Sequence, residues 1–145
     1  IDPELLLGFD PMLYLDLEIM GESPGGRPPF RMGAYGFRDD HPLASQVWGS
    51  MAEYLGARAE VLFSQVPENV TWFIRAKLLL RAIDERFNWI AFLHSKGCKV
   101  AAWTLNPEIP GYETLARRLL ASDVDYITTD NPLHMADRLK ELVEY

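Results

Sequence analysis

Polar side chains follow two apolar segments in the last third of the chain, at the point where each segment ends. KVAAWTLN (99–106) closes on Trp103 and Asn106, and VDYITTDNP (124–132) closes on Asp130. Short apolar runs of this kind are typical of buried strands, and parallel α/β sheets bind ligands at the carboxyl ends of their strands. The sequence therefore predicts a ligand site at this edge, with Trp103 and Asn106 as candidate substrate-binding residues.

Each of these three side chains also has a structural alternative. Trp103 can pack on neighbouring loops as a strand-end aromatic residue, and Asn106 can close the turn that follows its strand. Asp130 precedes Asn-Pro, which is a turn signature, so capping of the following turn or helix is the favoured interpretation for this carboxylate.

Asp16 and Glu18 are the candidate ligands for a divalent metal. They are two residues apart in LDLEI, so on a strand both carboxylates would lie on one face, and carboxylate oxygens are ligands of Mg²⁺ and Ca²⁺. The segment 12–20 also fits a helix, because Pro11 suits its first turn and Gly21 its end. The two carboxylates would then belong to the polar face of that helix, and the sequence leaves both interpretations open.

The other reactive side chains are given structural places. Cys98, the single cysteine, cannot form an internal disulfide and is expected in the core. His94 is expected to pack or cap near a helix end, and His41 and His134, which lie close to prolines at helix starts, are assigned no chemistry. The arginines within 21–40 are expected to be solvated, with a phosphate or lipid headgroup as the alternative partner.

Apolar periodicity predicts strands that alternate with helices. The predicted elements are a strand at 4–10, a strand or helix at 12–20, a Gly- and Pro-rich loop at 21–40, a helix at 41–56, a strand at 59–65, one or two helices over 70–95 with a break near 84–88, a strand at 99–105, a helix at 112–121, a strand at 125–129 and a helix at 134–145. This order is typical of parallel βα units with right-handed crossovers. The strand ends Phe9-Asp10 and Ser64-Gln65 would then join the same edge, and 99–105 would pair in parallel with 125–129.

Composition and charge limit the class of protein. With 48% apolar and 24% charged residues, the 145-residue chain is globular, as a single domain or part of one. A formal net charge of −7 argues against a general nucleic-acid binder, which normally has a basic face. We expect no transmembrane segment and no signal sequence, and the lone cysteine favours a reducing, cytoplasmic location. The opening ELLLGF without Met indicates a processed chain or a fragment of a longer protein.

Two motifs in the last fifty residues carry a family resemblance. The first follows the pattern H-x-x-G-x-x-V-x-x-W-T-x-N and the second the pattern V-D-x-I-x-T-D-x-P. The matching residues are His94, Gly97, Val100, Trp103, Thr104 and Asn106, then Val124, Asp125, Ile127, Thr129, Asp130 and Pro132. Over 91–132 the chain therefore resembles the carboxyl-terminal part of the glycerophosphodiester phosphodiesterase family.

The resemblance implies the last βα units of a TIM-type (β/α)8 barrel, with 21–40 as an insertion loop. The family hydrolyses a glycerophosphodiester to glycerol phosphate and an alcohol, with a divalent metal (Mg or Ca) and a histidine pair as base and acid. A glycerophosphodiester or another lipid-derived small molecule is then the implied substrate, and Trp103 would contact its alcohol portion.

The family's catalytic opening is missing from the sequence. Its H-R-G, E-x-D and H-D motifs have no match, so we expect the isolated chain to be inactive and name no catalytic residue. The alternative is a non-catalytic, barrel-derived binding or assembly domain. In a partial barrel the strand edges at 4–9 and 125–129 need a cover, which would be the missing barrel half, a second copy of the chain, or a rearrangement of 12–20.

Overall fold

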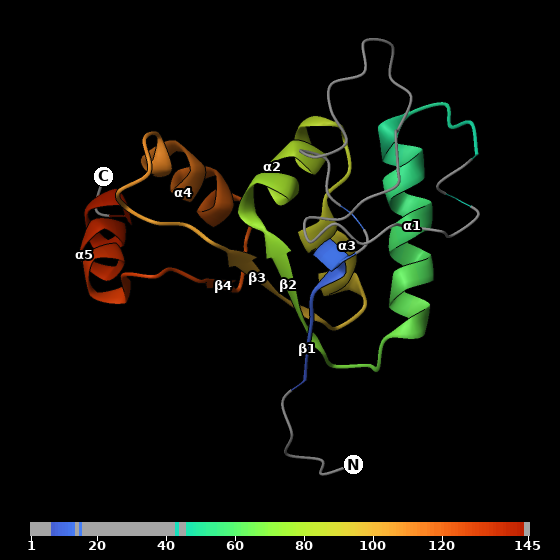
Figure 1. The fold of residues 1–145 in the computed structure, drawn as a ribbon, viewed down its shortest axis with the longest axis horizontal. Coiled ribbons are helices and arrows are strands. Elements are labelled where there is room, and N and C mark those ends of the chain that lie inside the picture. The colour runs from blue at the N-terminus through green and yellow to red at the C-terminus, as the bar shows by residue number, and fades with distance from the viewer. Residues whose placement is uncertain (1–6, 14, 16–42, 44–45, 144–145) are drawn as a thin grey trace.

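In a computed structural model of the chain, residues 7–13, 15, 43 and 46–143 are described. Four parallel strands form one sheet in the order β1-β2-β3-β4, which is also their order along the chain (Figure 1). The elements are β1 (Gly8–Phe9), η1 (Pro11–Leu13), α1 (Met51–Gln65), β2 (Thr71–Arg75), α2 (Ala76–Asp84), α3 (Trp89–Ser95), β3 (Lys99–Trp103), α4 (Tyr112–Ala121), β4 (Tyr126–Ile127) and α5 (Pro132–Val143). The predicted α/β class with parallel βα units is confirmed.

The unit β3-α4-β4 agrees with the sequence prediction. α4 has the predicted bounds 112–121, and it joins two adjacent parallel strands that pair Ala101 with Tyr126. β4 is shorter than the predicted 125–129, but hydrogen bonds continue the pairing beyond it. The Thr128 N–H donates to the Ala102 carbonyl at 2.8 Å, and the Leu105 N–H donates to the Thr128 carbonyl at 2.9 Å.

The prediction that 70–95 is helical from its start is wrong. TWFIR forms β2, in which Trp72 and Ile74 alternate with Phe73 and Arg75, and the strand pairs along its whole length with β3. Strand pairing decides the conformation here, because β-branched and aromatic residues fit a pleated, half-buried surface. The predicted break is confirmed, since α2 ends at Asp84 and α3 starts at Trp89.

The predicted strand at 59–65 is also wrong, because these residues belong to α1. Ser50 caps this helix by accepting a hydrogen bond from the Glu53 N–H at 3.2 Å, so the helix starts later than the predicted position 41. Leu55, Ala59 and Leu62 are buried at helical spacing. A short apolar run has no period of its own, which is why AEVLF can be mistaken for a strand.

Parts of the remaining predictions lie outside the described residues. These parts are 1–6, most of 12–20, the loop at 21–40 and residues 144–145. Within the described part, β1 occupies Gly8–Phe9, and η1 takes the first two residues of the ambiguous segment. The last helix starts two residues earlier than predicted, at Pro132. None of the described helices is long and apolar enough to cross a membrane.

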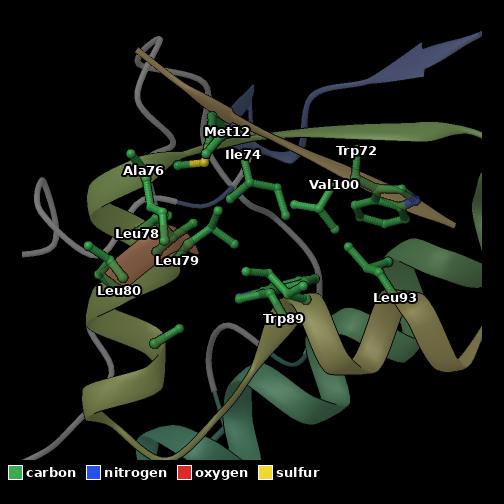
Figure 2. Close-up of a cluster of buried hydrophobic side chains, with 14 of the residues drawn as sticks. Met12, Trp72, Ile74, Ala76, Leu78, Leu79, Leu80, Trp89, Leu93 and Val100 are labelled. Atoms are coloured by element: carbon green, nitrogen blue, oxygen red, sulfur yellow. The ribbon is translucent and has the colours of Figure 1, made fainter. Parts of the chain in front are cut away.

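The core lies on one face of the sheet. Trp72 and Ile74 of β2 and Val100 of β3 point toward the helices, where Trp89 and Leu93 of α3 meet them (Figure 2). All five side chains are inaccessible to solvent or nearly so. Because neighbouring residues in a parallel register share a face, the sheet and the helices on this face form a single apolar unit.

The opposite face carries the other half of each strand. Phe73 pairs with Ala101, and Ala101 pairs with Tyr126, so these three side chains lie in one row across β2, β3 and β4. Phe73 remains 36% exposed and Tyr126 47% exposed. The two faces of the sheet therefore differ: one is packed against helices and the other keeps large aromatic side chains accessible.

The alternation in β2 yields a direct test with two adjacent residues. Trp72→Ala removes a fully buried indole and should lower the free energy of unfolding by about 3–5 kcal/mol. Phe73→Ala removes a partly exposed ring and should cost well under half of that. Urea unfolding of both variants, followed by circular dichroism, measures the difference, and equal losses would contradict the strand register.

Candidate functional site

Trp103 stands between two cavities at the carboxyl ends of β1, β2 and β3. One cavity of about 350 Å³ is lined by Gly8, Asp10, Phe73 and Trp103. The other, of about 290 Å³, is lined by Arg75, Ala76, Lys77, Trp103, Thr104, Leu105, Ile109 and Leu115. Trp103 is half-buried at the end of its strand, which is the position that the sequence predicts for it.

Two contacts fix the aromatic part of this cleft. The Arg75 guanidinium carbon lies over the Trp103 ring, 5.5 Å from its centroid, which is within the range of a cation–π contact. On β1, a Cβ atom at Gly8 would lie 2.6 Å from Cε2 of Phe73. Glycine at this position therefore lets the Phe73 ring approach the backbone of the neighbouring strand, and any larger residue would displace the ring from the cavity wall.

Asn106 connects the loop after β3 to the loop after β4. Its Nδ2 donates to Oδ2 of Asp130 at 2.7 Å, while its Oδ1 accepts hydrogen bonds from the Asp130 N–H at 2.9 Å and from the Thr129 hydroxyl at 3.0 Å. Both ends of the amide are thus used within the protein. The turn closure expected of Asn106 is present through its backbone, because the Ile109 N–H donates to the Asn106 carbonyl at 3.1 Å. The side chain, in addition, is a strap between two strand ends.

The cap of the last helix is Asn131 and not Asp130. Asn131 Oδ1 accepts from the His134 N–H at 3.3 Å, with Pro132 as the first helical residue. Asp130 has a structural role, as the sequence analysis favours. This role is a hydrogen bond to the side-chain amide of Asn106 and not a helix cap. The prediction located the right kind of residue in the turn and assigned the cap one position too early.

Glu108 and His134 form an exposed pair next to this strap. Oε1 of Glu108 lies 3.3 Å from Nδ1 of His134 and accepts a hydrogen bond from the Asn131 side chain at 3.0 Å. The hydrogen bond from its own backbone N–H, with these two side chains, outweighs desolvation and holds the pKa of Glu108 below its ordinary value. The loops after β3 and β4 are thereby joined by a second set of contacts.

His94 and Asp125 lie at the opposite, amino-terminal end of the sheet. Oδ2 of Asp125 is 2.8 Å from Nε2 of His94 and accepts a hydrogen bond from the Val100 N–H, also at 2.8 Å. The carboxylate therefore ties the start of β4 to the start of β3 and to the end of α3. His94 has a structural place, as predicted, and its partner comes from the second sequence motif.

The environment of Asp125 favours its charged form. Partial burial opposes ionisation, but the Val100 N–H, the His94 ring and the nearby Lys99 ammonium outweigh it, and together they hold the pKa of Asp125 below its ordinary value of 3.8. A group whose pKa is depressed by folding stabilises the protein while it is ionised, so this contact strengthens the fold above that pH.

The remaining predicted site residues are either outside the described part of the chain or away from the sheet edge. Asp16, Glu18 and the arginines within 21–40 lie outside the described residues. Ser64-Gln65 ends the helix α1 and not a strand, so the prediction that this dipeptide joins the sheet edge is wrong. Within the described part of the chain, no group of three His, Cys, Asp or Glu side chains could hold a metal ion.

The structure adds two residues that the sequence interpretation missed. Arg75 and Phe73 line the cleft, but both were assigned to a helix because β2 was not recognised. The alternation in TWFIR was the available signal. The approach of Arg75 to Trp103 across the β2–β3 pair had no sequence signal, because it depends on the register that places these two residues opposite each other.

Comparisons with known proteins give no match: no protein-family model, no curated protein and no solved structure resembles the chain closely enough. The expected resemblance to a known family therefore rests on the two sequence motifs alone.

Asp125→Asn tests the amino-terminal contact. It should lower the free energy of unfolding by about 1–2 kcal/mol near neutral pH, because it weakens charge-assisted hydrogen bonds to a partly exposed group. The loss should begin to shrink as the pH falls below 3.8 and disappear below the depressed pKa of the folded protein, where Asp125 is protonated in both states. Asp123→Asn is the matched control, since Asp123 has φ of 62°, which asparagine tolerates. Urea unfolding as a function of pH measures both, and a loss that does not depend on pH would contradict the account.

The contact between Asn106 and Asp130 can be tested by exchanging the two residues. Asn106→Asp places a carboxylate against Asp130 and should lower the melting temperature by several degrees, a loss of about 1–3 kcal/mol. Adding Asp130→Asn restores a donor opposite an acceptor and should recover most of the loss. Calorimetry of the two single variants and the double variant gives the coupling energy, and strictly additive losses would show that these side chains do not interact.

Proposed function

We propose that the chain is the carboxyl-terminal part of a (β/α)8 barrel of the glycerophosphodiester phosphodiesterase type. The winding of the sheet carries the proposal: four parallel strands follow one another in chain order, and the core lies on one face. Doubly wound sheets reverse their strand order at a switch point, whereas a barrel adds each new strand beside the last. In this proposal the face with Phe73, Ala101 and Tyr126 is the barrel interior.

The two motifs of the resemblance support the proposal because their residues meet as one unit. At the amino ends of β3 and β4, His94 contacts Asp125. At the carboxyl ends, Asn106 contacts Thr129 and Asp130. The motif residues thus join the two strands at both ends of the pair, and Trp103 lies at the cleft. In barrels, residues at the amino-terminal end serve stability and those at the carboxyl-terminal end serve the site.

The cleft beside Trp103 is where the phosphodiester would be hydrolysed. Trp103 would stack against the alcohol portion of the substrate, and Arg75 would contribute positive charge near the phosphate. Asp10 lines the same cleft from the end of β1. The base and acid of the reaction, which the family takes from a histidine pair, are assigned to barrel strands beyond this chain.

A divalent metal, Mg or Ca, belongs to the proposed chemistry, in which it would polarise the phosphate. Such ions take six or more oxygen ligands, and Asp10 is the one carboxylate that lines the described part of the larger cavity. The described residues therefore do not form a metal centre by themselves. Asp16 and Glu18 remain the proposed ligands within the chain.

The test is release of glycerol phosphate from glycerophosphocholine and glycerophosphoethanolamine in the presence of Mg²⁺ or Ca²⁺. The protein from the complete reading frame should be active, and the 145-residue chain alone should be inactive. In the complete protein, Trp103→Ala should raise KM by about tenfold, the equivalent of about 1.4 kcal/mol of lost binding. Trp48→Ala, which removes an indole away from the cleft that packs on Tyr54, is the matched control for KM.

Two results would contradict this proposal. Binding of glycerophosphodiesters without release of glycerol phosphate by the complete protein would favour the alternative, a non-catalytic binding or assembly domain. Metal-dependent release by the isolated chain would show that the chain holds its own catalytic groups, with Asp16 and Glu18 as the first residues to substitute.

A further inference from the structure

The smaller cavity beside Trp103 has two chemically different walls. One wall carries the basic residues Arg75 and Lys77, which come from the junction of β2 and α2. The other wall is apolar and consists of Leu105, Ile109 and Leu115, from the loop after β3 and from α4. The cavity measures about 290 Å³, near the lower end of the range typical of small-molecule sites.

The basic wall is suited to a phosphate group. Arg75 presents a planar guanidinium that lies over the Trp103 ring, 5.5 Å from its centroid, and guanidinium groups can bind phosphate oxygens in a bidentate manner. Lys77 adds a second positive charge two residues later. Thr104 lies at the same cavity and can donate a hydroxyl hydrogen bond to a phosphate oxygen.

The apolar wall is suited to a hydrocarbon chain. Ile109 is 40% exposed although it lines the cavity, and Leu115 is half-buried beside the core. Covering such surface with a ligand chain gains about 0.8 kcal/mol per buried methylene. Inorganic phosphate or a fully polar ester would leave this wall exposed to water, so the two walls together select a ligand with both parts.

We propose that this cavity binds a phosphate ester that carries an apolar chain, with the phosphate on Arg75, Lys77 and Thr104 and the chain along Ile109 and Leu115. This inference names the class of ester that the site prefers. Hydrolysis of such an ester rests on the proposed function. Binding itself needs no catalysis, and it can be measured on the chain alone.

The experiment is isothermal titration calorimetry of the 145-residue chain with inorganic phosphate and with ethyl, butyl and hexyl phosphate. Affinity should rise along the series, by at least tenfold from ethyl to hexyl phosphate, since four methylenes are added. Affinity should also fall with added salt, because ionic contacts are screened. Equal affinity for every ester, or no binding of any of them, would overturn the proposal.

Paired variants separate the two walls. Arg75→Gln and Lys77→Gln should each weaken every ester by about five- to tenfold, as expected for the loss of one charge-assisted contact. Ile109→Ser should abolish the gain with chain length while leaving ethyl phosphate binding nearly unchanged. Matched controls are Lys140→Gln, an exposed lysine of α5, and Leu133→Ser, an apolar side chain that is 81% exposed. Controls that reproduce either effect would overturn the assignment to this cavity.

A second arm distinguishes dissolved esters from membrane lipid. The chain is mixed with vesicles of phosphatidylcholine that contain phosphatidic acid, and cosedimentation is measured. We expect no cosedimentation, because the cavity holds one short chain and the proposal concerns dispersed esters. If the chain cosediments with the vesicles and Arg75→Gln removes this binding, the ligand is not a dissolved ester. The basic wall would then bind a lipid surface.

The inference and the proposed function fail in different ways. If alkyl phosphates bind as expected and the complete protein hydrolyses no glycerophosphodiester, the binding site stands and the enzyme does not. If the complete protein is active but prefers esters without an apolar chain, and hexyl phosphate does not inhibit it, the enzyme stands and the inference does not.

Discussion

The parallel pairing of β2 with β3 is the contact on which the rest of the structure depends. It runs through five residue pairs, from Thr71 and Lys99 to Arg75 and Trp103. Its register sends Trp72 and Val100 to the helices as the centre of the core (Figure 2). The same register brings Arg75 and Trp103 together at the carboxyl end, so a shift of one residue would exchange the two faces and dismantle both core and cleft.

The two ends of this strand pair have different chemistry. At the amino-terminal end, Oδ2 of Asp125 contacts His94 and accepts a hydrogen bond from the Val100 N–H, so this carboxylate holds the strands together. At the carboxyl-terminal end, Asn106 and Asp130 use their polar atoms in the same way. The side chains at the cleft include the Trp103 ring, the Arg75 guanidinium, the Asp10 carboxylate and apolar residues, which are groups that can contact a ligand.

The sequence predicted the parts of the fold whose pattern is local. The helix at 112–121 has its apolar positions at helical spacing and appears with the predicted bounds, and the parallel pair around it follows from βα order. The alternation in TWFIR is easily overlooked, because its apolar residues continue into a helix without a loop and the change of period falls at Arg75. For the site, Trp103 followed from strand order, whereas the cavity walls depend on pairing across strands and on the packing of α4, neither of which is visible in a single sequence.

We propose that the carboxyl ends of β2 and β3 form a phosphate-ester site, whereas their amino ends contribute to stability. The most direct measurement is an NMR titration of the isotope-labelled chain with butyl phosphate, followed through backbone amide shifts. We predict saturable shifts at residues 75–77 and 103–105 and unchanged signals for His94, Val100 and Asp125. Shifts centred on His94 and Asp125, or no saturable shift anywhere, would contradict the claim.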